Sequence, residues 1–178
     1  MIEDIVLNDN KTFRGFGKIP RLFRQCVITE KIDGTNACID VFTFNEKPES
    51  TGDVGDMFVY YDYVNHEYRA VMAGSRKRWI SPSDDNHGFA RWVFDNAVEL
   101  GEELGPGRHY GEWWGKGINR GYGLNERRFS LFNTSRWNAS NTKLCSVVPV
   151  LYEGPFSTMV ATTAVSYTHL TLPTIYSV

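Results

Sequence analysis

The sequence predicts an α+β domain built mostly from antiparallel strands with a few helices. Short β-prone runs, separated by loops rich in glycine, asparagine and serine, follow one another along most of the chain. One stretch, between Asp84 and Gly105, instead has the apolar periodicity of a helix. With 178 residues, of which 42% are hydrophobic, the chain is long enough to bury one sizeable core. A single domain is therefore expected.

The first predicted strands are two β-prone runs, Cys26–Ile32 and Ala37–Phe44, joined by Asp33-Gly34. Asp-Gly between apolar segments is a strong hairpin signal, because both residues tolerate positive φ. We therefore predict a β-hairpin that carries Lys31 at its mouth. Beyond a loop over 45–56, the next predicted strands are Met57–Tyr63 and Tyr68–Ala73.

The predicted helix places most of its apolar residues on one face, and Asp84 or Asp85 can accept hydrogen bonds from its first turn. Gly105 and Pro106 end it. The apolar residues are Phe89, Trp92, Val93, Ala97, Val98 and Leu104. After the helix, the predicted strands are Arg108–Trp114, Phe129–Asn133 and Val147–Tyr152.

Composition narrows the classes of function. The 19 Lys and Arg against 21 Asp and Glu leave a net charge of -2, so any contact with nucleic acid must be local. Cys26, Cys38 and Cys145 form no CxxC pair, which argues against a disulfide framework and a zinc site. The acidic N-terminus does not resemble a signal peptide, and no apolar run has membrane-spanning length. We expect a cytoplasmic protein without a membrane partner.

The last residues differ in character from the rest. From Val165 the sequence reads VSYTHLTLPTIYSV, which resembles the translation of a sequencing adaptor. The alternative is a genuine short strand-forming terminus. We interpret residues 1–163 as the natural chain and residues 164–178 as a non-native tail, excluded from reasoning about the fold.

Lys31 is a candidate nucleophile. A lysine attacks only as the free amine, and its unperturbed pKa of about 10.4 keeps it protonated at neutral pH. The neighbouring Glu30 and Asp33 would favour the charged form on direct contact, whereas a divalent cation bound by these carboxylates would reverse that effect. The alternative is a solvated cross-strand ion pair.

Four segments of the sequence carry a resemblance to a known family. Lys31-Ile32-Asp33-Gly34 matches the Lys-x-Asp-Gly nucleophile motif of the covalent nucleotidyltransferases, which are DNA ligases, RNA ligases and mRNA capping enzymes. EKIDGTN, GSRKRW, YGEWWGKGINRGYG and RRFSLFN, at Glu30–Asn36, Gly74–Trp79, Tyr110–Gly123 and Arg127–Asn133, occur in the order found in phage T4 RNA ligase 2-like enzymes. The chain thus resembles an ATP-dependent RNA ligase over residues 17–156.

The resemblance implies a role for each matching residue. Lys31 attacks the α-phosphorus of ATP, flanked by Glu30, Asp33 and Gly34, and Mg²⁺ or Mn²⁺ assists. Arg76 holds the ribose or phosphates, Glu112 binds a ribose hydroxyl, Phe132 or Phe129 stacks on adenine, and Lys116 and Arg120 contact RNA or the triphosphate. We prefer Phe132, although Asn133 stands where the family has aspartate.

Two later motifs implied by the resemblance are missing: a metal-placing glutamate and a Lys-x-Lys strand. Glu153-Gly154 is not taken as the first, because Pro155 follows where a strand should continue. The metal ligands are therefore unknown, and we expect a truncated, inactive ligase domain from a bacterial or phage-infected cell. Its partners would be RNA 5′-phosphate and 3′-hydroxyl ends, without an evident protein partner. The alternatives are a DNA ligase, a capping-type enzyme, a non-catalytic RNA- or nucleotide-binding module, and a fold whose KIDG is accidental.

Overall fold

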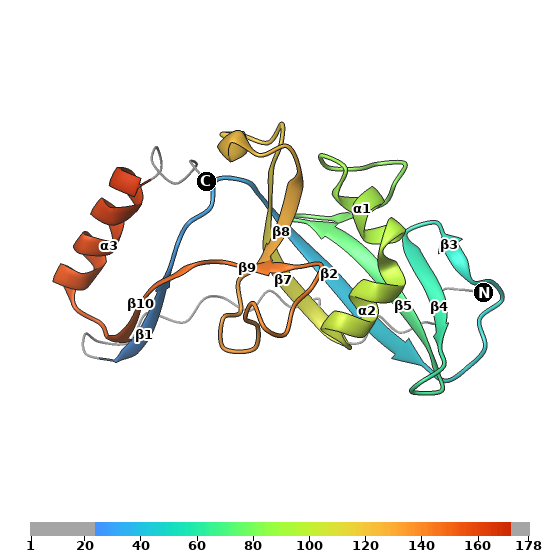
Figure 1. Ribbon diagram of the computed structural model, residues 1–178. Coiled ribbons are helices and arrows are strands. Elements are labelled where there is room, and N and C mark those ends of the chain that lie inside the picture. The colour runs from blue at the N-terminus through green and yellow to red at the C-terminus, as the bar shows by residue number, and fades with distance from the viewer. Residues whose placement is uncertain (1–23, 172–178) are drawn as a thin grey trace.

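The computed structural model describes residues 24–171. Ten strands, two α-helices of the central region, a short 3-10 helix and a C-terminal helix make up this part of the chain (Figure 1). In order they are β1 (Gln25–Thr29), β2 (Thr35–Phe44), β3 (Gly52–Val54), β4 (Met57–Asp62), β5 (Glu67–Ser75), β6 (Trp79–Ile80), α1 (Phe89–Asp95), α2 (Ala97–Leu104), β7 (Gly107–Gly115), η1 (Gly121–Gly123), β8 (Arg127–Leu131), β9 (Ser146–Val147), β10 (Val150–Pro155) and α3 (Thr158–Thr171).

The main sheet has the order β3-β4-β5-β2-β7-β8-β9, with β6 paired to β5. All its pairs are antiparallel except β8 with β9. The predicted α+β class with mostly antiparallel strands is therefore confirmed. The predicted strands at Ala37–Phe44, Met57–Tyr63, Tyr68–Ala73 and Arg108–Trp114 correspond to β2, β4, β5 and β7.

The core lies between the main sheet and the helices α1 and α2, which cover one face of it (Figure 1). Alternation along β2 directs Ala37, Ile39 and Val41 to this buried face. Phe89 and Leu100 of the helices are fully buried against them. The opposite face of β2 carries Asn36, Asp40 and the buried Cys38, so the polar side chains at this end of the strand face away from the helices.

The predicted hairpin across Asp33-Gly34 is wrong. β1 pairs with β10 in a separate two-stranded sheet, whereas β2 pairs with β5 and β7 (Figure 1). Residues Glu30–Gly34 therefore form an irregular link between two sheets, and Lys31 lies in this link rather than at a hairpin mouth. Hydrogen bonds from the link to β7 and to the loop after it replace the expected pairing between the two strands.

The predicted helix between Asp84 and Gly105 is divided in two at Asn96. This residue has φ -120° and ψ 23°, and its side-chain amide donates to Trp92 O at 2.7 Å. Such a side-chain bond competes with helical hydrogen bonding, so the helix breaks there. Asp85, which precedes α1, accepts hydrogen bonds from Ala90 N and Arg91 N, as expected for Asp84 or Asp85. Helix α2 ends at Gly105, also as predicted.

The predicted strand Val147–Tyr152 is also two strands. β9 ends at Val147 and pairs with β8, and β10 begins at Val150 and pairs with β1. The reason given against Glu153-Gly154, that Pro155 stands where a strand should continue, is wrong, because β10 includes Glu153, Gly154 and Pro155. Pro155 is the last residue of a strand in a two-stranded sheet, a position at which proline is tolerated.

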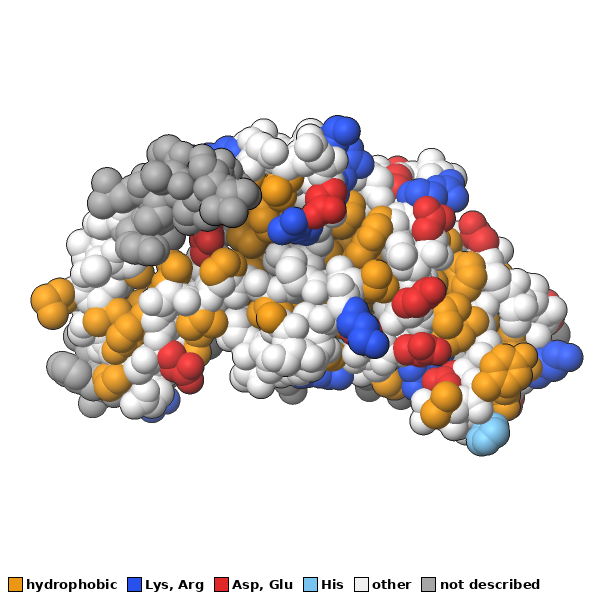
Figure 2. Space-filling view, viewed as in Figure 1, with side chains coloured by type: hydrophobic (Ala, Val, Ile, Leu, Met, Phe, Trp, Pro, Cys, Tyr) orange, Lys and Arg blue, Asp and Glu red, His pale blue; other side chains and the backbone are white. Residues whose placement is uncertain are grey.

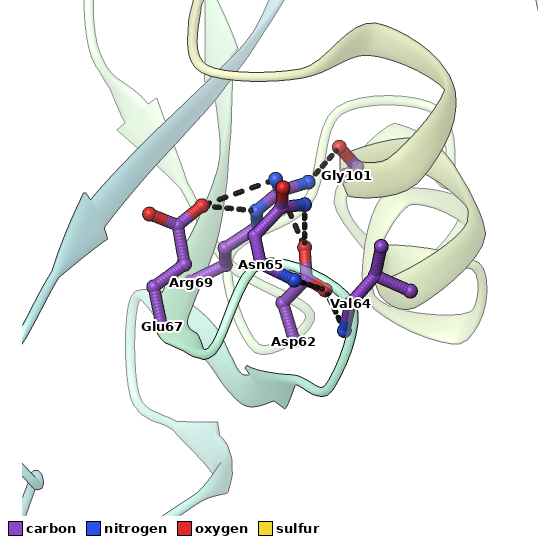
Figure 3. A network of polar contacts seen from close by, with 6 residues as sticks. All are labelled: Asp62, Val64, Asn65, Glu67, Arg69 and Gly101. Carbon is purple, nitrogen blue, oxygen red and sulfur yellow. Dashed lines mark hydrogen bonds and ion pairs between the residues drawn. The ribbon is translucent and has the colours of Figure 1, made fainter.

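A buried polar network connects the β4–β5 turn to α2 (Figure 3). Asp62 accepts hydrogen bonds from Val64 N and from Asn65, and its carboxylate lies 2.9 Å from Arg69 Nη2. Arg69 Nη1 in turn donates to Gly101 O at 2.9 Å. Hydrogen bonding from Asn65 is the largest cause that lowers the pKa of Asp62. The network holds the far end of the sheet to the helical layer.

Cys26, Cys38 and Cys145 are free cysteines in the structure. Within residues 24–171, no helix has both the length and the apolar character that a membrane crossing requires. Helix α3 spans both sides of position 163, and the expected origin of residues 164–178 stays a prediction.

Candidate active site

The candidate site is built around the link Glu30–Gly34, which we call the lysine loop. Glu30 N donates to Pro149 O at 2.9 Å, and Ile32, only 6% exposed, packs inward two residues later. Lys31 lies between these two fixed positions, and its side chain is exposed. The loop therefore displays an amine at one end of the main sheet, at the point where β2 begins.

The Glu112 carboxylate of β7 supports the lysine loop by hydrogen bonding. Its Oε1 accepts a hydrogen bond from Gly34 N at 3.1 Å, and its Oε2 accepts one from Asn36 Nδ2 at 2.8 Å. The residue is only 7% exposed. Burial raises the pKa of the Glu112 carboxyl, whereas the bonds from Asn36 and Gly34 and the charge of Lys31 act against that rise. The carboxylate thus links β7 to the loop and to the first residues of β2.

Close packing explains why residue 34 is a glycine. A Cβ at this position would lie 2.5 Å from Trp113 O, 2.7 Å from Trp114 Cβ and 2.9 Å from Glu112 Cγ. All three atoms belong to β7, which is paired on both sides, with β2 and with β8. Only a residue without a side chain allows the lysine loop to lie directly on this strand.

The loop after β7 also forms hydrogen bonds with the lysine loop. Asp33 N donates to Tyr122 Oη at 2.7 Å, and Asn119 Nδ2 donates to Asp33 Oδ1 at 3.1 Å and to Gly34 O at 2.7 Å. Arg120 Nε lies 3.5 Å from Asp33 Oδ2. Asn119 and Tyr122 have positive φ, of 46° and 51°, and the glycines around them permit this folded path. Asp33 is therefore held by three residues of one loop.

Of the other candidates implied by the resemblance, Arg76 lies at the same end of the sheet. It follows Ser75, which is paired with Ala37, and its side chain is exposed at the turn between β5 and β6. In residues 24–171 it forms no ion pair and no side-chain hydrogen bond. Lys116 instead lines a cavity beside Trp92 of α1, on the helical side of the sheet, and so lies apart from Arg120.

The two candidate phenylalanines have opposite environments. Phe129 is fully buried, with its ring centroid 5.2 Å from that of Phe89. Phe132 is 42% exposed and lines a cavity of about 250 Å³. Because Phe132 N donates to Tyr110 O, it continues the β7–β8 register and lies opposite Tyr110, on the Glu112 face. Of the two rings, only that of Phe132 is accessible to a ligand.

Asn36, Asn119 and Tyr122 were missed by sequence reasoning. Asn36 lies two residues from Gly34, so strand alternation places it on the face of Glu112, its register partner. An asparagine within a glycine-rich loop is a signal for a left-handed conformation, as found at Asn119. It does not indicate that Asn119 bonds to Asp33, 86 residues away in the sequence. Nothing in the sequence around Tyr122 indicates its hydrogen bond with Asp33 N.

No group of three or more His, Cys, Asp or Glu side chains that might hold a metal ion occurs within residues 24–171. Glu30 and Asp33 are the carboxylates nearest to Lys31 in the sequence, and the Asp33 carboxylate is engaged by Asn119 and Arg120. Protein residues alone therefore form no enclosed metal site in this part of the chain.

An α+β domain of mostly antiparallel strands is the architecture expected of a ligase domain. A model of the RNA ligase family matches residues 24–172. The chain therefore belongs to the RNA ligase family. The comparisons with curated proteins and with solved structures found no match.

Proposed function

We propose that this chain is the adenylyltransferase part of an ATP-dependent RNA ligase of the T4 RNA ligase 2-like kind. Lys31 Nζ attacks the α-phosphorus of ATP, so that a phosphorus–nitrogen bond forms, the bond to the β-phosphate oxygen breaks and pyrophosphate leaves. The AMP then passes to the 5′-phosphate of an RNA end. Attack by a 3′-hydroxyl joins the two ends and releases AMP.

The observation that carries this proposal is the support of the lysine loop by Glu112. Its carboxylate accepts hydrogen bonds from Gly34 N and Asn36 Nδ2. A carboxylate has about four acceptor positions, so two remain for a ribose hydroxyl. Such a hydroxyl would place the nucleotide over the polar face of β7, beside the exposed amine of Lys31. A lysine in a solvated ion pair would not need this buried support.

Phe132 and Arg76 complete the proposed nucleotide site. Phe132 has the accessible ring on the Glu112 face, which suits stacking on adenine. Arg76 is exposed at the end of the sheet that carries Lys31, and a guanidinium is well suited to phosphate oxygens. Arg120, which lies near Asp33, would face the phosphates from the opposite side.

Mg²⁺ or Mn²⁺ would neutralise phosphate charge and aid in-line displacement. Mg²⁺ is commonly bound by one or two carboxylates together with substrate phosphates, so the proposed cation would enter with ATP. Glu30 and Asp33 are the carboxylates of the lysine loop that would face it.

The test is self-adenylylation, followed as label from α-labelled ATP that remains on the denatured protein. No Lys-x-Lys occurs in the sequence, and such cationic groups stabilise a transferring phosphate. We therefore expect little label on residues 1–163 and clear label on a chain extended with the Glu-Gly and Lys-x-Lys strands of a related ligase. Lys31→Ala should abolish it.

Absence of label on a folded, extended protein with both ATP and GTP would reject covalent nucleotidyl transfer. Label from GTP alone would indicate a capping-type enzyme. Sealing of nicked DNA in preference to RNA by the labelled protein would indicate a DNA ligase.

A further inference from the structure

A second cavity lies on the helical side of the sheet, close to the lysine loop. It has a volume of about 420 Å³ and lies between the start of α1 and the adjoining ends of β7 and β8. We call it the Trp92 cleft and define it by Arg91, Trp92, Lys116 and Arg127. Trp113, which also lines it, is paired with Thr35 directly after the lysine loop. The cleft and Lys31 thus share one end of the sheet.

The charges of the cleft are not balanced. Within residues 24–171, the side chains of Arg91, Lys116 and Arg127 lie in no ion pair with a carboxylate. Glu126, at the rim, is already bound by Arg128 at 2.6 Å. Asp95 is then the one remaining carboxylate among the lining residues. Three cations against one anion make the cleft attractive to a polyanion.

The walls of the cleft are held in place by hydrogen bonds. Arg127 Nε donates to Lys116 O at 2.9 Å, and its Nη1 donates to His87 O at 2.8 Å. Trp113 Nε1 donates to the same carbonyl at 2.9 Å. Arg127 therefore connects the loop before α1 to the residue that follows β7, and its side chain remains exposed. A site with fixed walls loses less entropy when a ligand binds.

Trp92 contributes an aromatic surface. Its ring is half-buried, with the centroid 5.1 Å from that of Trp113 and 6.0 Å from that of Phe89. These contacts fix the ring, and its remaining exposed part borders the cleft. Figure 2 shows Lys and Arg side chains near the top of the molecule, over the region of β8 and the loop before α1, with hydrophobic side chains beside them. Aromatic rings beside cations are typical of surfaces that bind single-stranded nucleic acid.

We propose that the Trp92 cleft binds the RNA strand next to the ends that are joined, with phosphates on Arg91, Lys116 and Arg127 and a base against Trp92. This rests on the proposed ligase function, which supplies RNA as the polyanion. The triphosphate of ATP is a poorer occupant, because Glu112 and Asn36 lie on the opposite face of the sheet from Trp113 and Trp92. The RNA strand would pass from the cleft around the end of the sheet to Lys31.

The test measures binding of a fluorescently labelled, 5′-phosphorylated single-stranded RNA to the full chain by anisotropy, at several salt concentrations and without ATP. The variants are Arg91→Gln and Lys116→Gln, whose side chains make no hydrogen bond within residues 24–171. The control is Lys143→Gln, which removes the same charge from an exposed site near Glu103 of α2.

Each phosphate contact on a single strand contributes about 0.7 to the slope of log affinity against log salt, which corresponds to roughly 5-fold in affinity near 0.1 M salt. We expect each cleft variant to bind roughly 5-fold more weakly with a shallower slope, and Lys143→Gln to bind like the unchanged protein. Equal affinity and slope in the cleft variants and the control would overturn the proposal, as would absence of RNA binding by the unchanged chain. Either variant alone tests it if the other misfolds.

Self-adenylylation, assayed separately with labelled ATP, distinguishes this proposal from the proposed function. Cleft-dependent RNA binding by a chain whose extended form takes no label would support the cleft and reject the ligase mechanism. A labelled protein whose cleft variants bind RNA as tightly as the unchanged protein would support the ligase mechanism and reject the cleft as the RNA site.

Discussion

Gly34→Ala tests whether the lysine loop lies directly on β7. The new Cβ would be 2.5 Å from Trp113 O and 2.7 Å from Trp114 Cβ, closer than real Cβ contacts. Because β7 is bonded on both sides, the loop must move instead. Overpacking of this kind costs about 1–3 kcal/mol. Loss of the 3.1 Å bond from Gly34 N to Glu112 adds about 0.5–1.5 kcal/mol.

The free energy of unfolding should therefore fall by about 2–4 kcal/mol. For a domain of this size, each kcal/mol lowers Tm by roughly 2–4 °C, so the expected decrease is roughly 5–15 °C. Thermal unfolding followed by circular dichroism measures it. The control is Gly52→Ala, where a Cβ meets nothing within 4 Å and only the φ of +88° is unfavourable; its expected cost is about 1–2 kcal/mol. If Gly34→Ala melts within about 2 °C of the unchanged protein, or no lower than the control, the lysine loop does not lie directly on β7.

Three other predictions concern the loop, the polar network and the core. Asn119→Gly keeps the left-handed backbone but removes the two side-chain hydrogen bonds to Asp33 and Gly34. The rate of amide hydrogen exchange in the lysine loop, measured by mass spectrometry, should therefore rise roughly 5- to 30-fold. An unchanged rate would contradict this prediction. Asp62→Asn should cost about 3 kcal/mol near pH 7 by denaturant unfolding, since it breaks a buried ion pair. Because the pKa of Asp62 is lowered in the folded protein, its contribution to the free energy of unfolding is present above the pKa of an unfolded aspartate and is lost as pH falls through the folded pKa. The free energies of unfolding of the unchanged protein and of Asp62→Asn should therefore become equal in acid. A difference that does not depend on pH would argue against the network. Phe129→Ala should cost about 3–5 kcal/mol and Phe132→Ala less than about 0.5 kcal/mol in the same assay, and the reverse order would show that their environments are misassigned.

Strand positions were largely predictable from the sequence because alternation is a local pattern. In β2 the apolar side chains of Ala37, Ile39 and Val41 alternate with those that face the polar side. The same reasoning placed β4, β5 and β7. The helix was located correctly, but the break at Asn96 depends on one side-chain bond to Trp92 O that apolar periodicity does not reveal.

The candidate site was predictable in part. Lys31, Asp33 and Gly34 stand together in the sequence, and Glu112 was identified through the resemblance of the segment around it. Asn119 and Tyr122 were not, because their bonds to the lysine loop join residues more than 80 positions apart. The distinction between Phe129 and Phe132 likewise needed the sheet, since the sequence places them on opposite faces without showing which face the helices cover.

The sequence by itself determined the α+β class, the positions of most strands and the lysine motif, because side-chain alternation and neighbouring residues express these features locally. The tertiary structure decided that β1 pairs with β10 and not with β2, that Glu112 and the loop after β7 hold the lysine loop, and that Arg91, Lys116 and Arg127 meet around Trp92. These features depend on which distant segments bury one another's surface, and no local pattern along the chain specifies that choice.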